Sequence, residues 1–302
     1  MAVDLDWVAS RCTSALLLEV SATPKPGLVD RLKDFRETKF QHFLVSASTL
    51  YKWFRIAAKT GLHKKGKGLG RVIYRGVLDM LSDQKGGNTH LGAFLLLIPI
   101  ASASTLSQNT PIKISSLKKH LPEILSNMDW RDSVMILKAI KTVSPRSLGR
   151  IAFMDVFNQE TYREIEEKKL KPIEVFRKFV DREVVAHEWV KNYSRSFYGA
   201  SRLMENLREM DLEEALTQTF LQLLSRYTDT HIQRRGGKAL ATRISYMASK
   251  ILENGGVKNS RGRELLVELD KLLRNNWRTR PGATADLLAS SITITLLNGW
   301  IP

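Results

Sequence analysis

The chain has 302 residues, of which 47 are Lys or Arg and 31 are Asp or Glu, giving a formal net charge of +16. This length permits a buried core without staples, and the single cysteine excludes an intrachain disulfide framework. The excess of basic residues indicates either an anionic ligand, such as nucleic acid or a triphosphate, or a cell interior that demands a high surface charge. Because the start of the chain has no basic and apolar leader and the longest apolar run is about half a membrane span, we expect a cytoplasmic protein without a membrane anchor.

The first predicted element is a helix that ends before Thr23. Cys12 lies at helical spacing from Leu16, which predicts a small core residue and not a nucleophile. Glu19 lies on or beside the same apolar face. A buried carboxylate is costly unless it is paired or bound to a metal, so Glu19 is a candidate functional residue.

The segment that follows, Thr-Pro-Lys-Pro-Gly-Leu-Val-Asp-Arg at residues 23–31, cannot continue a helix. Each proline fixes its own φ and disfavours helical geometry in the residue before it, so Lys25 is held extended with little backbone entropy left to lose. Two interpretations remain open here: a helix stop followed by an ordinary turn, or a stiff, charged binding loop.

Helical periodicity dominates the rest of the chain, as at residues 40–58, 212–224 and 265–273, and alternating strand patterns are nearly absent. No Pro/Ser-rich linker divides the helical patterns into two halves. The sequence therefore predicts an all-α fold, a single domain over residues 1–302 built as one irregular bundle of about ten helices.

Three more polar, glycine-containing stretches lie at predicted helix ends: Gly-Gly-Asn-Thr-His-Leu-Gly at 86–92, Asp-Thr-His-Ile-Gln-Arg-Arg-Gly-Gly at 229–237 and Arg-Pro-Gly-Ala-Thr-Ala-Asp-Leu at 280–287. Helix N-termini present unpaired N–H groups and a partial positive charge, which suit phosphate. Local structural roles are compatible with this. Asn88 and Thr89 are also expected to cap a helix that begins near Leu91, and Asp229 and Asp286 to cap helices or to form ion pairs.

Taken together and in this order, the four stretches resemble the triphosphoribosyl-dephospho-CoA synthase family. That family has a TPKPGLVDR-like loop, a G-x-N-T-H-x-G turn, a D-T-x-x-x-x-R-G-G segment and a late P-G-x-x-A-D-L element. The resemblance runs from about Glu19 to Leu297. The short loop after Arg31, together with residues 155–157 and 181–183, looks more like the archaeal-type branch than the citrate-lyase-associated one. Leu91 stands where the family turn usually has a lysine, so one basic group that could contact phosphate is absent.

The resemblance implies a pentosyltransferase that moves the 5-triphosphoribosyl group of ATP to the ribose 2′-hydroxyl of 3′-dephospho-CoA and releases adenine. It implies catalytic carboxylates at Glu19, Asp30 and Asp229, and Mg²⁺ held by Glu19 and Asp229. The residues that it implies for substrate binding are Lys25, Arg31, Asn88, Thr89, His90, Arg235, Gly236 and Asp286.

Two alternatives to this function stay open. An enzyme of this fold and donor specificity could use another coenzyme precursor as acceptor, such as a pterin. A basic RNA-binding protein would explain the charge, but the chain lacks the clustered aromatic residues or the recognised module that RNA binding requires, so a nucleic-acid partner is not expected. The oligomeric state is also open, a homodimer included.

Overall fold

The computed structural model describes residues 3–143 and 154–302, and within them it contains fourteen α-helices and no strand. The all-α class is thereby confirmed. The helices are α1 (Leu5–Ser21), α2 (Phe40–Lys64), α3 (Leu69–Ser82), α4 (Leu91–Ser104), α5 (Ile114–Asn127), α6 (Trp130–Val143), α7 (Gln159–Glu167), α8 (Pro172–Arg177), α9 (Val184–Val190), α10 (Ser194–Asn206), α11 (Leu212–Arg226), α12 (Thr230–Glu253), α13 (Ser260–Lys271) and α14 (Gly282–Leu297).

The number of helices in the described residues exceeds the expected ten. The short helices α7, α8 and α9 have only 9, 6 and 7 residues. A helix of two turns shows too few apolar positions for its period to be recognised in a sequence.

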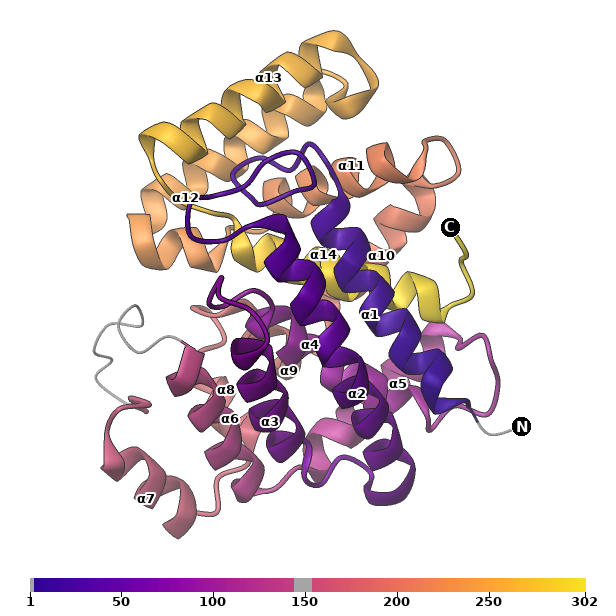
Figure 1. Cartoon of the computed structure of the whole chain (residues 1–302), viewed down its shortest axis with the longest axis vertical. Helices are drawn as coiled ribbons and strands as arrows, with labels where there is room; N and C mark the ends of the chain where they lie inside the picture. Colours follow the sequence, from indigo (N-terminus) through magenta and orange to yellow (C-terminus); the bar gives the residue numbers. More distant parts are fainter. Residues whose placement is uncertain (1–2, 144–153) are drawn as a thin grey trace.

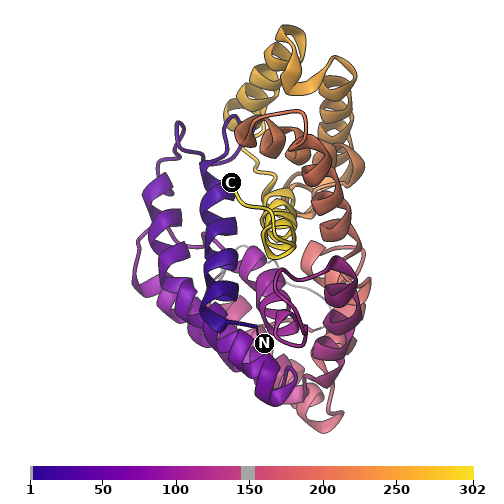
Figure 2. The same cartoon turned by 90° about the vertical axis from the view of Figure 1, so that its right-hand side faces the viewer.

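Helix α14 runs through the interior of the molecule, as Figures 1 and 2 both show. It packs against α1, α4, α10 and α11. Nearly all of its side chains are buried, and no side of the helix is polar, as expected for a helix surrounded by protein. The first turn of this helix is therefore held firmly, and it carries Thr284 and Asp286.

Two clusters of buried apolar residues meet at α14. One cluster is formed mainly by α1 to α6 and the other mainly by α10 to α13. Ile294 and Leu297 of α14 belong to the first cluster, and Leu288 and Ile292 belong to the second. Among the described residues, no helix combines the length and the apolar character that a membrane span requires.

The segment between α1 and α2 lies against α13, which is close to the C-terminus in sequence (Figure 1). The N–H of Gly27 donates to Oδ1 of Asp270 at 2.7 Å. Gly27 has φ +74°, and a Cβ there would lie 2.9 Å from Leu273, so only glycine fits this turn without strain. The loop predicted from its prolines is therefore pinned to the C-terminal part of the chain.

Candidate active site

Asp229 joins the starts of α12 and α14. Its Oδ1 accepts hydrogen bonds from the N–H groups of His231 and Ile232 at 2.9 and 3.0 Å. Its Oδ2 accepts from the N–H and the Oγ1 of Thr284, both at 2.8 Å. The carboxylate thus caps its own helix, as the sequence predicts, and fixes the first turn of α14 beside it.

Asp286, near the start of α14, contacts the first turn of α4. A Cβ on Gly92 would lie 2.0 Å from Oδ2 of Asp286, so the glycine makes the space that this carboxyl group occupies. The N–H of Ala93, in the first turn of α4, donates to Asp286. Burial raises the pKa of Asp286 well above its ordinary value, and the negative charges of Glu19 and Asp229 raise it further. Three carboxyl groups thus form an acidic centre: Glu19, Asp229 and Asp286.

Lys25 turns inward and pairs with Glu19. Its Nζ donates to the backbone oxygen and to Oε1 of Glu19, and the lysine is only 1% exposed. The ammonium group therefore satisfies a carbonyl in the last turn of α1 and also compensates the buried carboxylate. The proline-flanked loop thus delivers a cation to the acidic centre.

His90 lies beside this ion pair, at the start of α4. Burial lowers the pKa of His90 to about 4, and the charge of Lys25 lowers it as well. Nε2 lies 3.1 Å from the carbonyl oxygen of Phe43. Because a carbonyl only accepts, Nε2 carries the hydrogen, and Nδ1 of the neutral ring keeps its lone pair.

Of the other two members of this turn, Asn88 has the capping role that was expected, whereas the Thr89 hydroxyl contacts α2 instead of a helix N–H. Oδ1 of Asn88 accepts from the N–H of Leu91 at 3.0 Å, and the hydroxyl groups of Thr89 and Ser46 lie 2.7 Å apart. Asn88 is exposed and also faces the cavity described below. Capping and ligand contact are thus compatible at this position.

Three arginines form a basic rim around His231: Arg234, Arg235 and Arg280. Burial lowers the pKa of His231 to about 4, and the positive charges of these three arginines lower it further. Arg234 pairs with Glu183 at 2.5 Å, and the guanidinium of Arg280 lies 3.7 Å from the ring centroid of Phe35. Gly236 is exposed in the same segment and precedes Gly237, whose φ of +84° interrupts α12.

A cavity of about 200 Å³ opens next to the acidic centre and the rim. Its polar lining includes Asn88, His231, Arg234 and Asp286. Its apolar lining includes residues from the middle of the chain: Leu137, Ile140, Val175, Phe176 and Phe179. These apolar residues were not predicted as part of a site, because apolar positions on a helix also indicate core. The sequence favoured Arg235 for substrate binding, but Arg234 is the arginine that lines the cavity.

Asp30 and Arg31, which end the proline-containing loop, point in different directions. Asp30 is 1% exposed; its Oδ1 accepts from the N–H of Leu32 at 2.9 Å, and its buried Oδ2 has no hydrogen-bond partner in the described part of the chain. Arg31 is half exposed and pairs with Glu213 of α11 at 2.5 Å. The structure therefore does not bring Arg31 to the rim.

The predicted magnesium ligands, Glu19 and Asp229, do not fit a metal site in this arrangement. The two oxygens of Asp229 already accept four hydrogen bonds, and Lys25 contacts Oε1 of Glu19. Over residues 3–143 and 154–302, no group of three His, Cys, Asp or Glu side chains is placed to hold a metal ion.

A family model described as ATP:dephospho-CoA triphosphoribosyl transferase matches residues 5–302. The chain belongs to this family. A relative in Streptococcus equi subsp. equi, named probable 2-(5''-triphosphoribosyl)-3'-dephosphocoenzyme-A synthase, is 27% identical over 311 residues, covering 98% of each chain. The 2-(5''-triphosphoribosyl)-3'-dephosphocoenzyme-A synthase of Klebsiella pneumoniae is 27% identical over 295 residues, covering 93% of this chain and 88% of that protein.

A solved structure supports the same membership in the triphosphoribosyl transferase family. The crystal structure of a protein from Archaeoglobus fulgidus, assigned as a triphosphoribosyl-dephospho-CoA synthase, matches with a TM-score of 0.65 and 26% identity. The match covers 85% of this chain and 100% of that chain. The family expected from the four stretches is thus confirmed, and with it the transferase class.

Proposed function

We propose that this protein transfers the 5-triphosphoribosyl group of ATP to the ribose 2′-hydroxyl of 3′-dephospho-CoA and releases adenine. The observation that carries the proposal, beside family membership, is the acidic centre of Glu19, Asp229 and Asp286 next to a basic rim. Cleaving a bond to an anomeric carbon develops positive charge on the ribose, which nearby carboxylates stabilise. The triphosphate on the same sugar requires cations within reach.

The rim supplies those cations. Arg234, Arg235 and Arg280 lie near the N-termini of α12 and α14, whose partial positive charges add to theirs. Gly236 lets a phosphate approach the backbone closely. Lys25 takes part through Glu19, whose charge it compensates. Arg31 stays a predicted phosphate ligand, and it has to leave Glu213 to reach the rim.

The carboxyl groups divide the proton transfers between them. The raised pKa of Asp286 makes it the group best suited to carry a proton, which it donates to the departing adenine as the C1′–N9 bond breaks. The new bond joins C1′ to the 2′-oxygen of the acceptor, whose proton passes to a base. Asp30, whose buried Oδ2 has no hydrogen-bond partner in the described residues, stays the predicted base, although it does not line the cavity.

We assign the substrates to the cavity on the basis of its lining. Its apolar lining, which includes Val175 and Phe176, is suited to the adenine ring, and Asp286 lines the same cavity. The side chains of Asn88 and Thr89 and the Nδ1 lone pair of His90 offer hydrogen bonds to ribose hydroxyls. We propose that any magnesium in the reaction is held by the triphosphate. A cytoplasmic location and a homodimer stay predictions.

The test measures free adenine by chromatography after the protein is incubated with ATP, magnesium and dephospho-CoA. We expect release that depends on dephospho-CoA and falls at least 100-fold in Asp286→Asn. Asp83→Asn, an exchange of a surface carboxylate bonded to Thr49, serves as the matched control and keeps full activity. Adenine release without dephospho-CoA would mean that ATP is the donor but that the acceptor is another molecule. No adenine release from any of these mixtures would refute the proposal.

A further inference from the structure

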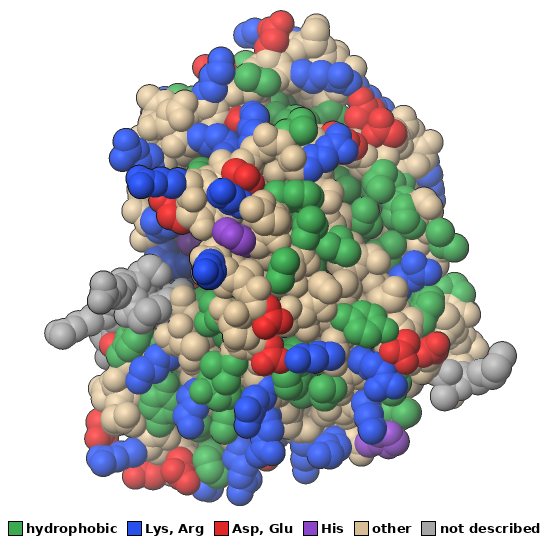
Figure 3. Space-filling view, in the orientation of Figure 1, with side chains coloured by type: hydrophobic (Ala, Val, Ile, Leu, Met, Phe, Trp, Pro, Cys, Tyr) green, Lys and Arg blue, Asp and Glu red, His purple; other side chains and the backbone are tan. Residues whose placement is uncertain are grey.

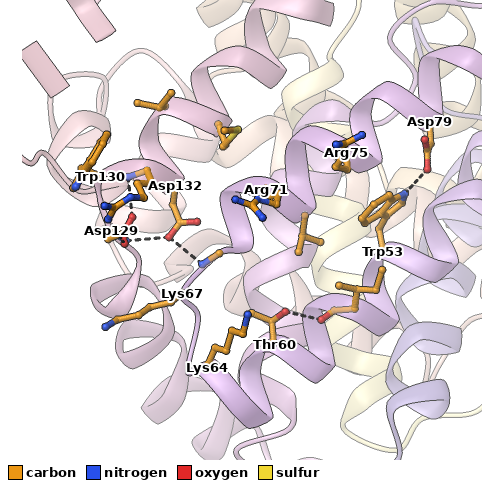
Figure 4. A pocket seen from close by; sticks show the side chains of 16 residues that line it. Trp53, Thr60, Lys64, Lys67, Arg71, Arg75, Asp79, Asp129, Trp130 and Asp132 are labelled. Atoms are coloured by element: carbon orange, nitrogen blue, oxygen red, sulfur yellow. Dashed lines mark hydrogen bonds and ion pairs between the residues drawn. The ribbon is translucent and has the colours of Figure 1, made fainter. Parts of the chain in front are cut away.

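A second cavity, of about 860 Å³, lies between α2, α3 and α6 and shares no lining residue with the candidate active site. Figure 4 shows it from close by. None of the four stretches that carry the family resemblance contributes to its walls. In Figure 3, Lys and Arg side chains gather over the lower part of the molecule, where α2 ends and α3 begins.

Four cations line this cavity without a partner. They are Lys64 at the end of α2, Lys67 just before α3, and Arg71 and Arg75 one turn apart on α3 (Figure 4). Across the residues that the structure describes, none of the four side chains forms an ion pair or a hydrogen bond. Like charges one helical turn apart repel one another, so this arrangement weakens the free protein unless an anion offsets it.

Two of the three carboxylates that line this cavity, those of Asp79 and Asp129, are paired with groups other than the four cations. Asp79 accepts from Nε1 of Trp53 at 2.9 Å and from Nζ of Lys52 at 2.8 Å. Asp129 accepts from the N–H of Arg131 at 2.8 Å. The four cations are thus not neutralised from within the cavity.

Asp132 makes the floor of the cavity rigid. It accepts from the N–H groups of Gly68 and Gly70 at 3.2 and 2.8 Å, which fixes the start of α3 on α6. A Cβ on Gly70 would lie 2.4 Å from the backbone oxygen of Asp132, so the two helices touch at this point. The arginines on α3 are therefore presented from a fixed element.

We propose that this cavity is a second anion site, which binds a chain of several phosphates. Arginine pairs with phosphate through two parallel hydrogen bonds, and lysine adds a mobile point charge. The volume lies within the range of small-ligand sites. The phosphates can belong to a nucleotide, to inorganic polyphosphate or to a nucleic-acid backbone, since all three offer the same chemistry.

The test is isothermal titration calorimetry of the full chain with inorganic tripolyphosphate. We expect the double variant Arg71→Glu/Arg75→Glu to lose at least 10-fold in affinity relative to the wild type. The control Lys119→Glu/Lys138→Glu changes the net charge equally at exposed positions outside both cavities and retains binding. Parallel titrations with ATP and with single-stranded RNA show which phosphate source the cavity prefers, because the preferred one binds most tightly among tripolyphosphate, ATP and RNA.

Two results would overturn this proposal. One is an equal loss of tripolyphosphate affinity in the two double variants, which would show a response to net charge only. The other is a loss of adenine release in Arg71→Glu/Arg75→Glu while thermal unfolding shows a folded protein, which would make the cavity part of the active site. Because the calorimetry requires no turnover, it is informative even where the wild type releases no adenine.

Discussion

At the scale of single residues, Gly92 decides where the Asp286 carboxyl group lies. Gly92→Ala puts a methyl group 2.0 Å from the present position of Oδ2 of Asp286, so the carboxyl group has to move. Since a displacement of about 1 Å can cost about 100-fold in rate, we expect a loss of adenine release of that order. In a protein that already carries Asp286→Asn, the further change Gly92→Ala should reduce adenine release only slightly. A second reduction of about 100-fold in that double variant would contradict the link between the two residues.

The buried imidazole of His90 makes stability depend on pH. Its pKa of about 4 in the folded protein lies below the usual 6.5, so the unfolded chain binds this proton more readily. The resulting stability is complete above pH 6.5 and is lost as the pH falls towards 4, by about 3 kcal/mol in all. His90→Gln should remove this part of the pH dependence in urea unfolding, whereas His63→Gln, at an exposed position, should not. If His90→Gln leaves the dependence of the unfolding free energy on pH unchanged, His90 is not the source of this pH dependence.

At the scale of elements, Asp229 joins two helices that begin 52 positions apart, at Thr230 and Gly282. Asp229→Ala leaves four donors without their acceptor, so we expect the free energy of unfolding to fall by about 3 kcal/mol or more. Thr284→Val removes one hydrogen bond and should cost about 1 kcal/mol. Urea denaturation measures both.

The control for this element is Asp211→Ala. Asp211 caps α11 through a single hydrogen bond to the N–H of Glu214, at 2.8 Å. Its loss should cost about 1 kcal/mol. Equal losses in Asp229→Ala and Asp211→Ala would mean that Asp229 caps α12 without holding α14.

At the scale of the whole molecule, α14 contributes side chains to both apolar clusters, so neither can unfold without exposing part of this helix. We therefore expect one cooperative unfolding transition, in keeping with the predicted single domain. Trp189 reports on the first cluster and Trp277 on the second. Variants in which one of these two is the only tryptophan left, the other five of the six being replaced by phenylalanine, should give the same urea midpoint by fluorescence and by circular dichroism. Two distinct midpoints would indicate two units that unfold independently.

The sequence by itself determined the all-α class, the family and the placement of the polar stretches at helix ends. These are local properties: apolar periodicity sets the helices, and proline, glycine and capping residues set their limits. The capping roles of Asn88 and Asp229 could be predicted for the same reason. The short helices α7 to α9 could not, because two turns carry too little periodicity.

The direction of each functional side chain was decided only by the tertiary structure. Lys25 turns inward to Glu19 and Arg31 outward to Glu213, although the two lie only six positions apart in one loop. Gly92 and Asp286 are nearly two hundred positions apart, yet the absent side chain of one makes room for the other. Such contacts depend on how α4, α12 and α14 pack, and no local pattern in the chain records that packing, because burial and charge act between residues that only folding brings together.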